Sequence, residues 1–132
     1  MTTVIEYPDL ELWLAGYFRS KLTAWAAKAD RRWPKSGNGY DVVVRDDSGP
    51  DAQFHADRMV GVTVLGPQGE QASTQRCAER VAALLRASPE DRATPVVRTN
   101  AVRGPYAIAS DTNRPAYYLT AGLRVVGSPV TL

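Results

Sequence analysis

The longest alternating pattern in the chain reads Ala116-Tyr117-Tyr118-Leu119-Thr120-Ala121-Gly122-Leu123-Arg124-Val125-Val126. Successive side chains of an extended strand point to opposite faces. One face of this segment therefore carries Tyr117, Leu119, Ala121, Leu123 and Val125. The opposite face carries Tyr118, Thr120, Gly122, Arg124 and Val126. We predict a long strand over residues 116–126, and the rest of the sheet has to come from segments that precede it.

Three earlier segments have the composition of strands. They are residues 40–45, 58–65 and 95–102, which are rich in Val and Thr and bounded by Gly, Pro or Asp. Gly61 interrupts the second segment, so we expect a bulge or a close neighbour at that point. Residues 103–115 contain Gly104-Pro105 and are predicted to form a long loop, a feature that is usually functional or disordered in a compact domain.

Two segments have the spacing of amphipathic helices. Apolar residues recur at every third or fourth position from Leu10 to Trp25, and Asp9 precedes them as a potential N-cap. The second helix is predicted over residues 70–87. Trp13 lies off the tightest part of the first apolar stripe. It either widens the buried face or is offered to a neighbouring subunit.

The elements follow the order α-β-β-α-β-β. This order predicts the α+β class, with a four-stranded, mostly antiparallel sheet packed by two helices. A chain of 132 residues, 44% of them hydrophobic, suits one domain over residues 1–132. We expect residues 1–8 and 127–132 to be mobile arms.

The composition excludes several functional classes. Sixteen basic and 14 acidic residues give a net charge of +2, which is too small to indicate a polyanionic partner. A single cysteine excludes a disulfide framework and a cysteine-rich zinc site. No apolar run approaches the ~18 residues of a spanning helix, and residues 1–9 lack a signal-peptide pattern. We expect a soluble, intracellular product without a membrane partner.

The residues that carry chemistry do not form a recognisable catalytic or metal pattern. His55 is the only histidine, and the sequence places no partner beside it. Cys77 falls on the apolar face of the second predicted helix, where a thiol packs as a small hydrophobe. An acidic group precedes the second strand, but its spacing does not match a calcium loop; it consists of Asp46, Asp47, Asp51 and Asp57. We predict no enzymatic activity, no metal and no cofactor.

The most basic aromatic segment contains Arg31, Arg32, Trp33 and Lys35. These side chains could contact phosphates and stack on a base. Cations at the C-terminal end of a helix also interact favourably with the helix dipole, which is the simpler explanation. A small nucleic-acid-binding domain that uses Arg31, Arg32, Trp33 and Arg45 stays an alternative.

The ordered features resemble the tail terminators, also called tail completion proteins, of long-tailed bacteriophages, particularly those that infect actinobacteria. The resemblance spans nearly the whole chain and depends on the order of the segments. They are residues 9–14, 58–64 and 75–85, Gly104-Pro105-Tyr106, residues 111–114 and the closing strand 117–125.

The resemblance implies a noncatalytic virion protein that assembles in the cytoplasm of the bacterial host. Copies would form a hexameric ring that caps the head-proximal end of the tail tube, ends tail polymerisation and joins the tail to the head. The implied partners are copies of the chain itself, the major tail tube protein and the head-side connector or stopper protein. Genomic DNA would pass through the lumen without sequence-specific binding. The alternative within this class is another head-to-tail connector protein, such as a stopper or an adaptor.

A ring built from head-to-tail contacts requires two different complementary patches on each copy. We expect the first contact, with tail tube or connector subunits, in the loop 103–115, since aromatic and arginine side chains are enriched in such contacts. Its candidate residues are Arg103, Tyr106, Ile108 and Arg114. For the acidic residues Asp46, Asp47 and Asp51 we expect a second contact facing the lumen, where like charges keep DNA from adhering.

Overall fold

The computed structural model describes residues 1–35, 37–52, 54–110 and 112–132. Asp111, which belongs to the predicted loop, lies outside the described residues. The α-helices are α1 (Leu10–Lys21) and α2 (Gln71–Ala87), each followed by a 3-10 turn, η1 (Thr23–Trp25) and η2 (Ser88–Glu90). The strands are β1 (Thr3–Glu6), β2 (Lys28–Asp30), β3 (Asp41–Asp46), β4 (His55–Leu65), β5 (Val96–Ile108), β6 (Ala116–Val126) and β7 (Ser128–Thr131).

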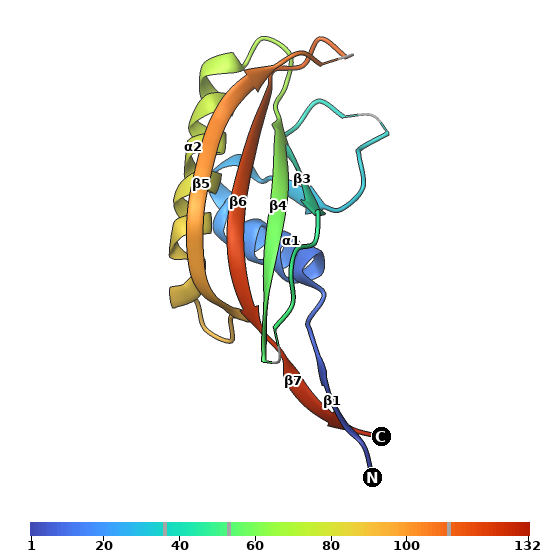
Figure 1. The fold of residues 1–132 in the computed structure, drawn as a ribbon. Helices are drawn as coiled ribbons and strands as arrows, with labels where there is room; N and C mark the ends of the chain where they lie inside the picture. Colours follow the sequence, from blue (N-terminus) through green and yellow to red (C-terminus); the bar gives the residue numbers. More distant parts are fainter. Residues whose placement is uncertain (36, 53, 111) are drawn as a thin grey trace.

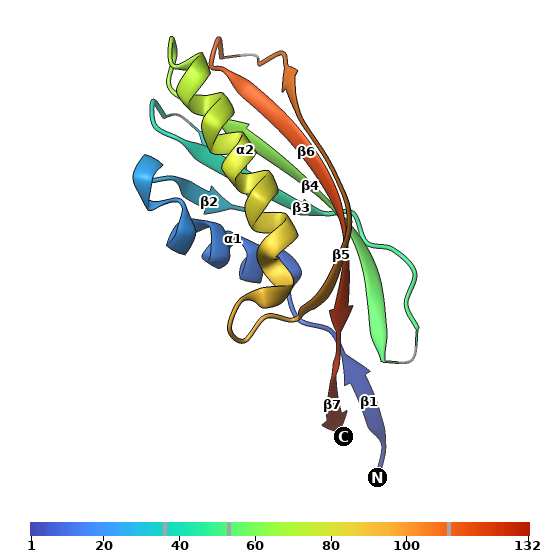
Figure 2. The same cartoon turned by 90° about the vertical axis from the view of Figure 1, so that its left-hand side faces the viewer.

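Five strands form one mixed sheet in the order β2-β3-β4-β6-β5. Strand β2 runs parallel to β3, and the other neighbouring strands are antiparallel. Both α-helices lie on the same face of this sheet, and no helix in the described part of the chain covers the opposite face (Figure 2). Strands β1 and β7 pair with each other in a separate antiparallel ribbon that projects from one end of the sheet (Figure 1).

The structure is α+β with two α-helices, but the predicted four-stranded antiparallel sheet and its element order are wrong. The prediction missed β1, β2 and β7. Strand β2 has only three residues, too few to show an alternating pattern, and its parallel pairing makes the sheet mixed. The terminal segments predicted to be mobile arms contain β1 and β7, which pair from Thr3 opposite Thr131 to Glu6 opposite Ser128. Their mobility stays a prediction.

The predicted loop 103–115 is also largely wrong, because its first six residues belong to β5. Gly104-Pro105 reads as a turn in the sequence, yet the strand continues through it with an irregularity in register between Arg103 and Tyr106. Gly104 has a φ of +97°, a left-handed conformation that glycine adopts without the usual steric penalty. Only residues 109–115 connect β5 to β6.

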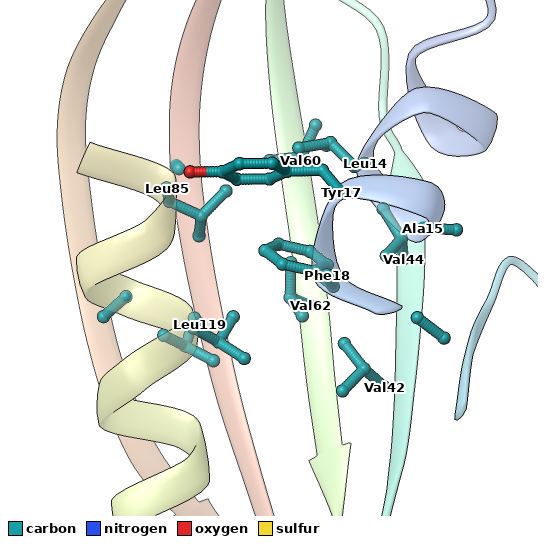
Figure 3. Close-up of a cluster of buried hydrophobic side chains, with 14 of the residues drawn as sticks. Leu14, Ala15, Tyr17, Phe18, Val42, Val44, Val60, Val62, Leu85 and Leu119 are labelled. Atoms are coloured by element: carbon teal, nitrogen blue, oxygen red, sulfur yellow. The ribbon is translucent and has the colours of Figure 1, made fainter. Parts of the chain in front are cut away.

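The core lies between the helices and the sheet. Helix α1 contributes Phe18, which lies over Val62 of β4, and Tyr17, which lies beside Val60 (Figure 3). Leu85 of α2 and Leu119 of β6 belong to the same core. The hydroxyl of Tyr17 donates a hydrogen bond to the carbonyl of Leu84 at 2.8 Å and so links the two helices. The predicted N-cap is confirmed, because the carboxylate of Asp9 accepts a hydrogen bond from the Leu12 amide at 3.0 Å.

Candidate assembly surface

The face of the five-stranded sheet that carries no helix is called the outer face here. Residues directly opposite each other on neighbouring strands share a face, so the strand register fixes which side chains lie together. The register gives three rows of side chains from β4 across β6 to β5. They are Leu65-Ala116-Ile108, Thr63-Tyr118-Tyr106 and Gly61-Thr120-Arg103. Apolar and aromatic side chains thus occupy the first two rows, at one end of the outer face. Arg103 lies in the third row.

Two of the apolar side chains are unusually exposed for their size. Tyr106 is 57% exposed and Ile108 is 41% exposed, and both come from the edge strand β5. Arg103 lies in the next row, is exposed, and makes no ion pair among the described residues. Protein interfaces are enriched in tyrosine and arginine relative to the remaining surface. Three of the residues predicted for the first contact therefore lie together on one surface, although on a strand rather than a loop.

Tyr118 lies flat against the sheet beside Tyr106. A Cβ atom on Gly61 would stand 2.5 Å from the hydroxyl oxygen of Tyr118, which is too close for a real contact. Gly61 therefore leaves room for the Tyr118 side chain, and the close neighbour expected at this glycine is confirmed. Arg45 of β3 also reaches the hydroxyl of Tyr118, with Nη2 and the oxygen 3.5 Å apart. The centre of the outer face is thus preorganised by contacts between β3, β4 and β6.

An open groove of about 510 Å³ adjoins the apolar end of the outer face. Its floor includes Leu65, Ile108 and Ala116, and the exposed indole of Trp33 lines it from the segment between β2 and β3. The groove extends the apolar surface of Tyr106 and Ile108 past the end of the strands.

Arg114 stands beneath this groove, and it is only 9% exposed. Its Nε donates to the Gly66 carbonyl at 3.0 Å, while Nη2 donates to the Gly39 carbonyl at 2.6 Å and to Oδ2 of Asp41 at 2.8 Å. The guanidinium therefore ties Arg114 to the ends of β3 and β4. The structure corrects the expectation that Arg114 is an exposed anchor, because its donors are engaged inside the protein.

The acidic residues predicted to face the lumen are paired with arginines of the same chain. Oδ1 of Asp47 lies 2.7 Å from Nε of Arg45, and Oδ2 of Asp46 lies 3.8 Å from Nε of Arg58. Arg58 also forms an ion pair with Asp51. Two arginines thus offset part of the charge of the three carboxylates, which weakens the expected repulsion of DNA, and the position of these residues at a lumen stays a prediction. Asp47 borders the outer face through Arg45.

The remaining candidates lie away from the apolar end of the outer face. Trp13 is half-buried, and its ring stacks on Tyr17 with the centroids 4.9 Å apart. Trp13 thus widens the buried face of α1. His55 is half-buried at the start of β4, and no group of three potential metal ligands occurs within the described ranges.

The chain was compared with known proteins. No protein-family model matches the sequence, and no curated protein matches it either. Within the described residues, no helix is long and apolar enough to span a membrane.

Cys77 is expected to be unreactive in the folded protein. The thiol is fully buried in the core, and burial raises its pKa to about 12, so roughly one thiol in ten thousand is ionised at pH 8. Native protein treated with a thiol-specific chromogenic reagent at pH 8 should release almost no colour, whereas protein unfolded in guanidinium should release one equivalent per chain. Fast labelling of the native protein would show that the helix opens readily.

Proposed function

We propose that this protein is a phage tail terminator, whose copies form a ring at the head-proximal end of the tail tube. The observation that best supports assembly is the outer face, where Arg103, Tyr106 and Ile108 project from a rigid sheet beside an apolar groove. The specific role in tail termination is inferred from the resemblance in the order of the sequence segments. The protein works by contact with its own copies and with neighbouring particle components.

The two sides of the sheet suit the head-to-tail contacts of a ring. Such contacts join two different patches, and they close into a ring when the rotation between copies completes a circle. The outer face is aromatic and carries exposed arginine, whereas the opposite side exposes the polar face of α2 with Gln75, Arg76 and Glu79. We propose that the outer face of one copy meets the α2 side of the next.

The test of the function is electron microscopy of lysates from a phage that lacks this chain. Uncapped tails of variable length that are not attached to heads are expected. Tails of normal length attached to heads would reject the proposal. Localising the tagged chain in complete particles then separates a terminator at the tail end from a stopper at the head connector.

Tyr106→Asp is expected to prevent assembly without unfolding the subunit. The side chain is mostly exposed, so the effect on stability should stay within about 0.5 kcal/mol. A buried aromatic anchor contributes about 2 kcal/mol or more to an interface, which corresponds to a loss of at least about thirtyfold in affinity. Complementation of the defective phage with this variant should yield at least tenfold fewer infectious particles, while circular dichroism stays unchanged.

The matched control for Tyr106→Asp is Leu12→Asp, which also replaces an exposed apolar side chain with aspartate. Leu12 lies on α1 and so belongs neither to the outer face nor to α2. Full complementation is expected for the control. Equal complementation by the two variants would show that the outer face does not take part in the proposed interface.

The nucleic-acid alternative is less well supported by the charges in the structure. Arg31 forms ion pairs with Asp9 and Glu11, and Arg45 forms one with Asp47. Two of its proposed phosphate-binding cations are therefore already neutralised within the chain. A filter-binding assay measures the affinity of the protein for nucleic acid. An affinity that falls steeply as the salt concentration rises would support this alternative.

A further inference from the structure

The ribbon formed by β1 and β7 is held at its base and projects from the body of the protein (Figures 1 and 2). At the base, the Gly127 amide donates to the Phe54 carbonyl at 3.3 Å, and the Tyr7 hydroxyl donates to the Ala52 carbonyl at 3.0 Å. Beyond the base, each strand of the ribbon pairs only with the other in the described part of the chain. An isolated two-stranded ribbon is marginally stable in water, so this element gains from a further strand.

The hydrogen-bond pattern shows which backbone groups of the ribbon point outward. The Leu132 amide donates to the Thr2 carbonyl at 2.7 Å, which makes these two residues a hydrogen-bonded pair. Hydrogen-bonded and non-hydrogen-bonded pairs alternate along an antiparallel ladder. Val4 therefore bonds to β7, while the N–H and C=O groups of Thr3 and Ile5 point away from β7. These four groups have no hydrogen-bond partner among the described residues.

The other strand edges carry features that oppose pairing. On β7, Pro129 lies opposite Ile5, so its nitrogen faces outward and has no hydrogen to donate. On β2, the carbonyl of Ala29 already accepts a hydrogen bond from Nη1 of Arg19 at 2.7 Å.

Strand β5 is the remaining edge of the large sheet, and it is irregular. Its register with β6 shifts at three places, and Pro105 offers no N–H. Bulges and prolines of this kind protect edge strands against pairing with another chain. Among the described strands, β1 alone presents a regular edge with no such protection.

We propose that β1 pairs antiparallel with β1 of a second copy, about a two-fold axis that passes through Val4. Thr3 of each copy then faces Ile5 of the other, and their outward N–H and C=O groups satisfy one another in four hydrogen bonds. The two Val4 side chains meet across a non-hydrogen-bonded pair, where the Cα atoms lie about 4.5 Å apart. Glu6 falls opposite Thr2, so this register brings no like charges together.

The result is a continuous four-stranded sheet in the order β7-β1-β1-β7. This contact uses the same patch on both copies, so it differs from the head-to-tail contacts proposed for the ring. A few residues per strand bury far less than the ~1,000 Å² of a stable interface, so the free pair dissociates readily. Covalent trapping is therefore the suitable measurement.

The test uses Val4→Cys in the full chain, with oxidised glutathione as oxidant and non-reducing electrophoresis as readout. Two thiols become one disulfide as one oxidised glutathione is reduced to two thiols. A rapid intermolecular dimer is expected, because the Cα separation across the axis falls within the range of about 4.4–6.8 Å that a disulfide spans. Cys77 is fully buried and contributes no background.

The matched control is Val130→Cys, which lies directly opposite Val4 in the same ribbon but on the edge that Pro129 interrupts. Its dimer should form at least tenfold more slowly. A second variant, Val4→Cys with Ile5→Pro, removes one outward N–H and leaves the bonds to β7 in place. Cross-linking of this double variant should also slow at least tenfold.

Equal cross-linking rates for Val4→Cys and Val130→Cys would overturn the proposed pairing, as would a rate that Ile5→Pro leaves unchanged. A Val4→Cys protein that stays monomeric would overturn it as well. None of these outcomes bears on tail termination, which the lysate experiment tests separately.

Discussion

Leu119→Asp is expected to abolish folding of the protein. Leu119 of β6 is 0% exposed and belongs to the core between the helices and the sheet (Figure 3). The substitution removes the packing of a buried leucine, which costs about 2–5 kcal/mol, and adds an unpaired carboxylate to an apolar site. Together these costs approach the whole stability of a typical domain, which is about 5–15 kcal/mol. The variant should accumulate as insoluble protein, and any soluble fraction should lack a cooperative thermal transition.

The matched control is Val126→Asp, which introduces the same charge into the same strand. Val126 is 42% exposed on the outer face, so its carboxylate stays hydrated and the stability should change by no more than about 0.5 kcal/mol. A soluble Leu119→Asp protein with a melting temperature close to that of the parent would show that β6 does not carry the core.

The alternation that predicts β6 also predicts its buried face, and the structure buries all five residues assigned to it. This succeeds because burial on one side of a sheet imposes a two-residue period on the sequence. The same reasoning fails for β2, where Lys28-Ala29-Asp30 is too short to show any period. It also fails for β7, because Pro129 argues against a strand unless its nitrogen faces outward.

The candidate site was predictable where it depends on exposed side chains. Tyr106 and Ile108 stand out in the sequence as apolar residues in polar surroundings, and the structure leaves both exposed. The role of Arg114 could not be predicted, because its partner Asp41 lies 73 residues earlier in the chain. The charges of the acidic segment were misread for a similar reason. Asp46 pairs with Arg58, which lies 12 residues later on β4, and the pairing of β3 with β4 brings the two close. Arg45 lies only two residues before its partner Asp47.

Arg114→Met is expected to destabilise the protein by about 3–5 kcal/mol. The substitution leaves the buried carboxylate of Asp41 without its partner, and it removes the donors to the carbonyls of Gly39 and Gly66. Uncompensated burial of a charge costs far more than the loss of an exposed ion pair, because water cannot replace the missing partner. The free energy of unfolding in urea measures this loss.

The comparison that isolates burial is Arg45→Met, which breaks the exposed pair with Asp47, two residues later in the chain. Exposed pairs contribute about 0–1 kcal/mol, so this variant should unfold close to the parent. Adding Asp41→Asn to Arg114→Met should recover part of the lost stability, since it removes the stranded charge while keeping the shape of the side chain. If Arg114→Met cost no more than Arg45→Met, the bonds of the guanidinium to Asp41, Gly39 and Gly66 would not stabilise this end of the sheet, and the groove beside it would depend on other contacts.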